Sequence, residues 1–449
     1  MRTRTAVLAM ACAATIAAST VVAQEGEATT QRHGPQFKLG AEVKLDFRHS
    51  SFQEFRLSFP APPSFFAPGD DALYMRTPAA GNSFEVQDVE LSAEAEWTPS
   101  FRARLAVHAL DLYNRNPTSS AERIEVREAW LLAGTRYDAL RPQDGTRVYL
   151  LVGKAPRFTK QLDRHLESYG LWGTAVGRFE QLQVQLGGSL GPHVYWRLHA
   201  ANPNPLFMRD PEALAGDFGT PETVPGRVNP IYQSGFPILY DTQAQDLNLS
   251  GHVELGGGGG LRFVDAADQK GIDVLGWYFE RKLEDKARIH GSYYEGDLEM
   301  LRGAGGPTLD YSGHKREEHG LNVQARLAGL RVFGQYVWQD LAGLKRQGFE
   351  ADLAYRIPLD GLFVSGDTPM MNWIQPALRY SSLDNKFSGP SDFVAPSFFW
   401  DWTKLDAGVR LGIVAKVDLT IEYERSQMTL TSGRTISLSE LLATLRCAF

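Results

Sequence analysis

The segment ELLATLRCAF, residues 440–449, decides the fold class because its side chains alternate in character along the chain. Successive side chains of a β-strand point to opposite faces of the sheet. One face of this segment is wholly apolar and is formed by Leu441, Ala443, Leu445, Cys447 and Phe449. An apolar strand at a free chain end would expose an edge that invites aggregation. The pattern therefore predicts the last strand of a closed barrel, with its apolar face in lipid.

The same two-residue period recurs along the chain, and it separates apolar from charged side chains in 36–48, 83–97, 100–113 and 402–414. These stretches exceed the roughly 5–6 residues of a soluble strand and reach the roughly 9–11 that a tilted membrane strand needs. Short turns, as at 98–100, 328–330 and 415, alternate with the long loops 49–82, 155–177, 202–242, 299–316 and 384–401. The sequence therefore predicts an all-β, transmembrane antiparallel barrel with short periplasmic turns and long extracellular loops. A soluble β-sandwich is the alternative.

The strand count follows from these segments and comes to about 18, with 16 as the alternative. Both chain ends then lie on the periplasmic side, which requires an even number. The count includes strands at 243–255, 259–266 and 286–298. The run Gly256 to Gly260 is expected to be a flexible turn, since no Lys-Ser/Thr pair follows it as in a phosphate-binding loop.

One charged residue does not fit the predicted faces. Glu128 falls between Val126 and Trp130 on the face assigned to lipid, where an unpaired carboxylate is costly. A bulge, an error of register or a contact between subunits would each explain it.

Residues 1–23 have the form of a secretory signal peptide. Arg2 and Arg4 precede an apolar stretch, which ends in the small-residue exit Val21-Val22-Ala23. The mature chain, residues 24–449, is then one barrel with 44 basic and 53 acidic residues and a net charge of −9. This acidic balance argues against a nucleic-acid partner. Cys447 is the single cysteine left, so no intrachain disulfide is expected.

No local arrangement of residues indicates catalysis, a metal site or a cofactor. His193 and His199 share a strand face, but their separation of roughly 20 Å is too large for one metal ion. No Ser–His pair with an orienting third group stands out in the sequence. The chain is therefore not expected to be an enzyme.

The inward-facing residues are expected to line a water-filled lumen, because 16 to 18 strands enclose more space than side chains fill. Both charge signs occur on this face, and the pore-lining candidates are Arg102, Arg104, Arg123, Arg127, Arg178, Arg197, Glu90, Glu94 and Arg410. Opposed charges across a pore create a field that orients polar solutes.

The loop 155–177 is the candidate constriction, with its amphipathic middle expected to fold inward as a short helix. Its charged residues are Arg157, Lys160, Asp163, Arg164, His165 and Glu167. Charged side chains at a narrow point are the usual basis of channel selectivity.

The stretches IEVREAWLLAG (124–134) and VYLLVGKAPRF (148–158) resemble the phosphate-selective porin-like group of Gram-negative porins. The resemblance implies a location in the bacterial outer membrane and a loop after the fifth strand that narrows the channel. It also implies insertion by the barrel-assembly machinery, which reads a terminal pattern like that at Phe449, and it allows a homotrimer. The mixed charge of the predicted lumen departs from the dense basic ladder of phosphate-selective members.

The function expected from the sequence is passive diffusion of small polar or anionic solutes through an outer-membrane porin. One alternative is an export channel for an acidic polysaccharide, since the chain also resembles 18-stranded exporters of that class. The other is a non-conducting scaffold or adhesin that binds through loops 49–82 and 202–242. Loop 202–242 contains seven prolines, which restrict the chain and favour a defined lid or plug over a floppy loop.

Overall fold

The computed structural model describes residues 35–52, 81–110, 124–134, 146–172, 180–202, 253–265, 270–283, 313–386, 401–429 and 433–449. Residues 162, 169, 360 and 367 are excepted, and short strands are described between 54 and 76 and between 215 and 237. The expected signal peptide lies outside the described residues, as do most of loops 49–82 and 202–242.

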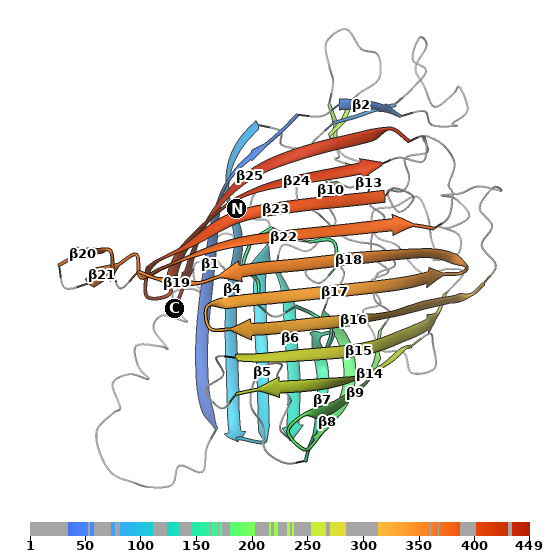
Figure 1. The fold of residues 1–449 in the computed structure, drawn as a ribbon, viewed down its shortest axis with the longest axis vertical. Coiled ribbons are helices and arrows are strands. Elements are labelled where there is room, and N and C mark those ends of the chain that lie inside the picture. Colours follow the sequence, from blue (N-terminus) through green and yellow to red (C-terminus); the bar gives the residue numbers. More distant parts are fainter. Residues whose placement is uncertain are drawn as a thin grey trace.

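Sixteen antiparallel strands form a closed ring, because β1 pairs with both β4 and β25 (Figure 1). In ring order the strands are β1 (Gln36–Ser50), β4 (Gly81–Thr98), β5 (Phe101–Leu110), β6 (Ile124–Gly134), β7 (Arg147–Pro156), β8 (Glu180–Leu190), β9 (Val194–Ala201), β14 (Glu254–Val264), β15 (Lys270–Lys282), β16 (Lys315–Leu327), β17 (Leu330–Leu341), β18 (Leu344–Tyr355), β22 (Trp373–Asn385), β23 (Asp401–Val414), β24 (Val417–Thr429) and β25 (Thr435–Ala448).

The remaining strands are short and lie outside this order. β19 (Ile357–Pro358) continues β18 along β22, and β20 (Phe363–Ser365) and β21 (Thr368–Met370) form a hairpin that projects from the ring (Figure 1). A four-stranded sheet contains β2 (Glu54–Leu57), β3 (Leu73–Arg76), β11 (Thr220–Glu222) and β12 (Ile231–Gln233). Another pair is β10 (Ala215–Gly216) with β13 (Phe236–Pro237).

The predicted barrel is confirmed, and the ring has the alternative count of 16 strands. It closes with the one strand β14 in place of the expected strands at 243–255 and 259–266, and without the expected strand at 286–298, because β9 pairs directly with β14 and β15 pairs directly with β16. Residues 243–252 and 286–298 lie outside the described residues. The described part of the chain contains no helix, and therefore no helix that could cross a membrane.

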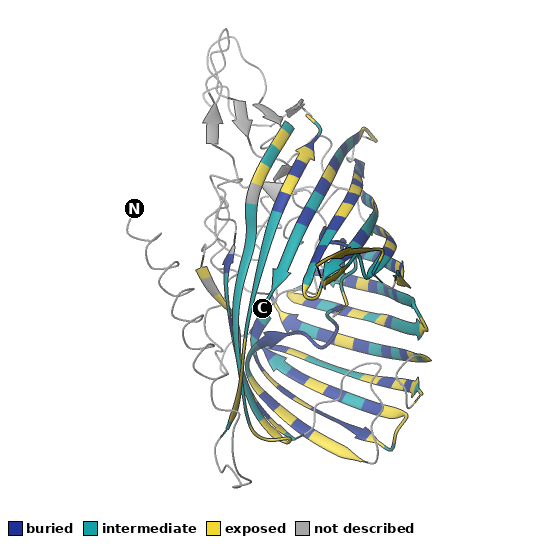
Figure 2. Ribbon diagram, turned by 90° about the vertical axis from the view of Figure 1, so that its left-hand side faces the viewer, coloured by how far each residue is buried: buried dark blue, intermediate teal, exposed yellow. Residues whose placement is uncertain are grey.

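Buried and exposed side chains alternate along the strands of the ring (Figure 2). The exposed face carries many large apolar side chains, whereas the buried face carries many polar and charged side chains together with apolar ones. On β25, Leu441 is 41% exposed while its neighbours Glu440 and Leu442 are buried. Phe449 at the chain end is 71% exposed, and its N–H donates to Ala41 O of β1. The ring is therefore a transmembrane β-barrel, and the last strand closes it against the first as predicted.

The prediction of a flexible turn at Gly256 to Gly260 was wrong, because these glycines lie within β14. A Cβ added at Gly256 would overlap the ring of Phe279, and one at Gly260 would overlap the ring of Tyr195. The glycines thus leave room for aromatic rings of the two neighbouring strands. Interior glycines of strands often mark such a close approach.

A β-bulge explains the misfit of Glu128. The β5–β6 register shifts between Ala106, which pairs with Glu128, and Val107, which pairs with Val126. Arg127 is therefore the extra residue of the bulge. Bulges insert one extra residue and re-aim the side chains that follow. The carboxylate of Glu128 accepts hydrogen bonds from Arg104 Nε at 3.1 Å and from Trp130 Nε1 at 2.9 Å.

Candidate functional site

The segment 157–172 follows β7 and contacts inward-facing side chains of the ring. It begins at Arg157, which is 2% exposed and pairs with Glu254 of β14 and Glu318 of β16, each at 2.8 Å. Burial alone would lower the pKa of Arg157, but the two carboxylates raise it above its ordinary value. Two residues later Asn322 Nδ2 of β16 donates to Thr159 O at 3.1 Å. The first part of the segment is therefore fixed along β14 and β16.

The middle of the segment is held by a carboxylate of the wall. The backbone N–H groups of Glu167 and Ser168 donate to the carboxylate of Glu422 on β24, at 3.0 and 2.6 Å. The side chain of Glu167 pairs with Lys44 of β1 at 2.8 Å. Arg379 of β22 donates to Ser168 Oγ at 2.7 Å. Buried backbone groups need such partners, so the strands fix the path of the segment.

The charge of Glu167 is stabilised by its surroundings. Burial alone would raise the pKa of Glu167, but Lys44, Arg164 and Arg410 lower it well below its usual range. A carboxylate whose pKa is depressed in the folded protein stabilises the fold at any pH above its pKa in the unfolded chain, which is near 4.3. This stabilisation is lost only as the pH falls below that value. The contact between the segment and β1 therefore persists at neutral and mildly acidic pH.

The end of the segment is anchored by Trp172, which is 1% exposed. Its backbone N–H donates to Glu350 Oε2 of β18 at 2.8 Å, and its indole Nε1 donates to Ser382 O of β22 at 2.7 Å. A Cβ added at Gly348 of β18 would overlap the indole, and one at Gly170 would overlap the Glu350 carboxylate. The two glycines thus create the space in which this anchor fits.

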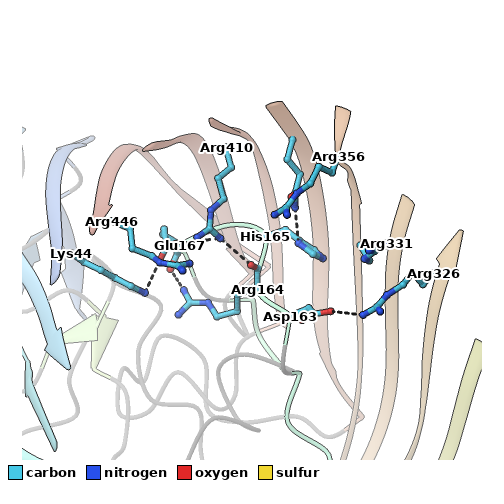
Figure 3. Close-up of a pocket in the computed structure, with 11 residues that line it drawn as sticks. Lys44, Asp163, Arg164, His165, Glu167, Arg326, Arg331, Arg356, Arg410 and Arg446 are labelled. Carbon is cyan, nitrogen blue, oxygen red and sulfur yellow. Dashed lines mark hydrogen bonds and ion pairs between the residues drawn. The ribbon is translucent and has the colours of Figure 1, made fainter. Parts of the chain in front are cut away.

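A cavity of about 440 Å³ lies between the middle of the segment and the wall (Figure 3), within the roughly 300–1,000 Å³ usual for small-molecule pockets. The segment contributes Asp163, Arg164, His165 and Glu167 to its lining. The strands and the residue after β18 contribute Lys44, Arg326, Arg331, Arg356, Gln375, Arg410 and Arg446. The cavity lies toward the end of the ring that holds the C-terminus, because Arg326 and Arg331 flank the 328–329 turn at that end.

The predicted constriction residues therefore divide into two groups. Arg157 lies with Glu254 and Glu318, and Lys160 pairs with Glu180 at 3.1 Å, both away from the cavity. The other four candidates line the cavity together. The short helix expected in this loop is not found in its described residues, which form turns and bends. Backbone N–H groups that a helix would have satisfied internally are bonded to wall carboxylates instead.

The predicted pore-lining residues are spread around the ring, mostly in ion pairs. Arg104 pairs with Glu90 at 3.1 Å, Arg102 with Glu94 at 3.9 Å, Arg127 with Glu180 at 2.8 Å and Arg410 with Asp418 at 2.8 Å. Arg197 donates to Phe158 O at 3.0 Å. Arg123 and Arg178 lie outside the described residues. Of the members of this set that the structure describes, Arg410 alone lines the cavity.

Sequence reasoning did not single out Arg326, Arg331, Gln375 or Arg446 as site residues. Arg326 and Arg331 are direct cross-strand partners, because the tight turn Ala328-Gly329 joins their strands. The proximity of these two arginines could therefore have been predicted from the turn. The positions of Gln375 and Arg446 opposite the segment depend on closure of the ring and carry no local signal. Among the described residues, no cluster of His, Cys, Asp or Glu is arranged to hold a metal ion.

The histidine in the cavity is neutral at physiological pH. Burial lowers the pKa of His165 to about 4, with Arg410, Arg331 and Arg356 adding to the effect and Asp163 opposing it. We expect wild type and His165→Gln to show the same zero-current potential between about pH 8 and about pH 5. Below that range both proteins lose carboxylate charge, and His165 gains a proton in the wild type, so the potential of the wild type should shift further in the anionic direction than that of His165→Gln. Zero-current potentials across a KCl gradient measure this, and a difference between the two proteins near neutral pH would contradict it.

Comparison with known proteins rests on structure alone, since no family model and no curated protein sequence matches the chain. The outer membrane channel DcaP of Acinetobacter baumannii is 10% identical, with a TM-score of 0.48 over 94% of this chain and 100% of that one. OprB of Pseudomonas putida is 10% identical, with a TM-score of 0.49 over 93% and 94%. The anion-selective porin from Comamonas acidovorans is 9% identical, with a TM-score of 0.43 over 92% and 100%. These likenesses are too distant to carry a solute or an assembly over to this chain.

Proposed function

We propose that the protein is a passive diffusion channel of the bacterial outer membrane for small polar and anionic solutes. The observation that carries the proposal is the position of segment 157–172 against inward-facing side chains of the ring, from β1 to β24. A ring of 16 strands is wide enough to leave an aqueous channel. A segment held inside such a ring narrows it, so this segment is the proposed constriction.

The location follows from the two faces of the ring. An apolar outer face and a polar inner face, alternating along every strand, are what outer-membrane barrels require. The proposed partners are therefore outer-membrane lipid and the barrel-assembly machinery, together with the small polar solutes that pass. A homotrimer is the proposed assembly, and the mass of the protein–detergent complex tests it.

The preference for anions is supported by the cavity. Its lining contains seven cationic side chains and two carboxylates, and rings of Arg and Lys favour anions in pores. Elsewhere on the inner wall the charges are mixed, as in the buried pairs Arg379–Asp406 and Lys404–Glu424. The proposed selectivity thus depends on the cavity and not on the lumen as a whole.

Planar-bilayer recording with the purified protein tests the channel. Discrete openings with a zero-current potential of anionic sign would support it. Absence of openings would favour the non-conducting scaffold or adhesin. The export channel for an acidic polysaccharide would require a conduit that is basic along its whole length, and the mixed wall charges do not favour it.

Removal of residues 160–167 tests the constriction. We expect a higher single-channel conductance, because the side chains that occupy the lumen beside β1 and β24 are lost. Shortening the β20–β21 hairpin is the matched control, since this hairpin projects beyond the ring and should leave conductance unchanged (Figure 1). Equal conductance of the 160–167 deletion and the wild type would refute the constriction.

A further inference from the structure

The connection between β18 and β22 is longer than the barrel requires. At the same end of the ring, the turn 328–329 joins β16 to β17 and the turn 415–416 joins β23 to β24. Residues 356–372 make the corresponding connection here, and their β20–β21 hairpin extends past the ring at the end that holds the C-terminus (Figure 1). Short turns mark the periplasmic end of an outer-membrane barrel. The hairpin is therefore an addition on the periplasmic side that strand connection alone does not explain.

The base of the hairpin is hydrogen-bonded to the wall. Met371 N–H donates to Ile413 O at 2.8 Å, and Asn372 N–H donates to Gly412 O at 2.9 Å, both on β23. Met371 has a φ of +58°, a conformation that residues other than glycine keep only where their surroundings fix it. β19 pairs with β22 just before the hairpin begins. The hairpin is therefore held in a defined position at the rim of the wall.

The hairpin presents apolar side chains on both of its faces. Leu362, Phe363 and Val364 are successive residues, and they are 59%, 58% and 67% exposed. Successive side chains of a strand point to opposite faces. Contiguous exposed apolar surface marks contact with another protein or with a membrane, and a two-stranded hairpin alone is marginally stable in water. The hairpin therefore requires an apolar partner.

The apolar surface of the hairpin continues the lipid-facing surface of the wall. On the outer face of β18 and β19, Leu353, Tyr355 and Ile357 follow one another at two-residue steps and are 45%, 49% and 39% exposed. The next exposed large apolar side chains along the described chain are those of the hairpin. Residues 357–372 include two aspartates and no basic residue. This continuity favours lipid as the partner, and the charge favours contact through apolar burial over attraction to a polyanion.

The reach of the hairpin matches the headgroup layer of a bilayer. β20 and β21 have three residues each, so they span roughly 10 Å. Headgroups add roughly 5–8 Å on each side of the hydrocarbon core. A hairpin fixed at the rim of the wall can therefore contact the headgroup layer along most of its length.

We propose that the β20–β21 hairpin is an interfacial anchor, which inserts Leu362, Phe363 and Val364 among the lipids of the periplasmic leaflet. Its partner is a phospholipid surface, bound through the burial of apolar area. The anchor fixes the depth of the β18–β22 side of the barrel in the membrane. It lies beside the lumen, so it does not depend on whether the barrel conducts.

Fluorescence quenching in vesicles tests the position of the hairpin. Cys447→Ser removes the one cysteine that follows the expected signal peptide, and Val364→Cys then carries the fluorophore NBD. In phosphatidylcholine vesicles we expect nitroxide-labelled lipids to quench this probe and iodide, present on both sides, to leave it nearly unquenched. Leu353→Cys on the outer wall is the lipid reference, and Asp163→Cys, whose side chain is 59% exposed in the lumen, is the aqueous reference.

Each other outcome of this experiment has a definite meaning. Iodide quenching equal to that of Asp163→Cys, without quenching by the lipid nitroxides, would place the hairpin in water and overturn the anchor. Shielding from both quenchers would show that the hairpin is covered by another copy of the protein, which would also overturn it.

Variants show whether the apolar side chains cause the insertion. The probe is moved to Ser365→Cys at the end of β20. Leu362→Ser/Phe363→Ser/Val364→Ser should abolish its quenching by lipid nitroxides and make it accessible to iodide. Leu362→Ile/Phe363→Leu/Val364→Ile, the matched control, should keep the quenching of the parent protein. Urea unfolding should be the same for both, since the hairpin lies outside the ring, and equal lipid quenching in the two variants would overturn the proposal.

Discussion

Replacing Gly348 by valine should displace Trp172 and raise the single-channel conductance. The indole of Trp172 lies where the new side chain would be placed, since even a Cβ at Gly348 overlaps its ring. The backbone of β18 should accept the change, because β-branched residues suit strands better than glycine does. Overpacking of this kind costs about 1–3 kcal/mol. The overlap is relieved when Trp172 moves away from β18, and this movement breaks the hydrogen bond from Trp172 Nε1 to Ser382 O.

Two further proteins make this test specific. Gly334→Val places the same side chain on the adjacent strand β17, where an added Cβ has nothing within 4 Å, and should leave conductance unchanged. Trp172→Ala should raise conductance by itself. The double variant Gly348→Val/Trp172→Ala should then equal Trp172→Ala, since contacting residues are not additive. A folded Gly348→Val channel with wild-type conductance would show that Trp172 does not hold the segment.

The closure of the barrel was predictable from local pattern, whereas the strand through the glycine run was not. Alternation in 440–449 and in 36–48 placed both segments on strands that pair, and β1 and β25 do pair in the structure. Gly256 to Gly260 have no side chains to alternate, so the period was lost there. What makes them a strand is the packing of Tyr195 and Phe279 from adjacent strands, and that is a tertiary effect.

The candidate site was only half predictable for a related reason. The charged residues of segment 157–172 were visible in the sequence, but its path depends on Glu422 and Glu350, which lie far away along the chain. The sequence around an acidic residue on a wall strand does not indicate that its carboxylate will accept hydrogen bonds from the backbone N–H groups of a loop. The cationic half of the cavity likewise comes from several strands that only the closed ring brings together.

Replacing Arg379 by methionine should destabilise the barrel by about 3–5 kcal/mol, the usual loss when one partner of a buried ion pair is removed. Arg379 is fully buried and pairs with Asp406 at 2.8 Å. In register it stands between Asp352 of β18 and Asp406 of β23. The variant would leave these buried carboxylates without the cation that separates them, and would also remove the hydrogen bond to Ser168 of the segment.

The effect of Arg379 on the stability of the barrel can be measured separately from its effect on the position of segment 157–172. Urea unfolding in detergent should show the loss for Arg379→Met, whereas Arg102→Met should change stability by less than about 1 kcal/mol, because its pair with Glu94 at 3.9 Å is part-exposed. Ser168→Ala removes the hydrogen bond to the segment while Arg379 keeps its carboxylates. If Ser168→Ala raised conductance and left stability unchanged, Arg379 would serve both the wall and the segment. Equal stability losses in Arg379→Met and Arg102→Met would contradict the buried-charge argument.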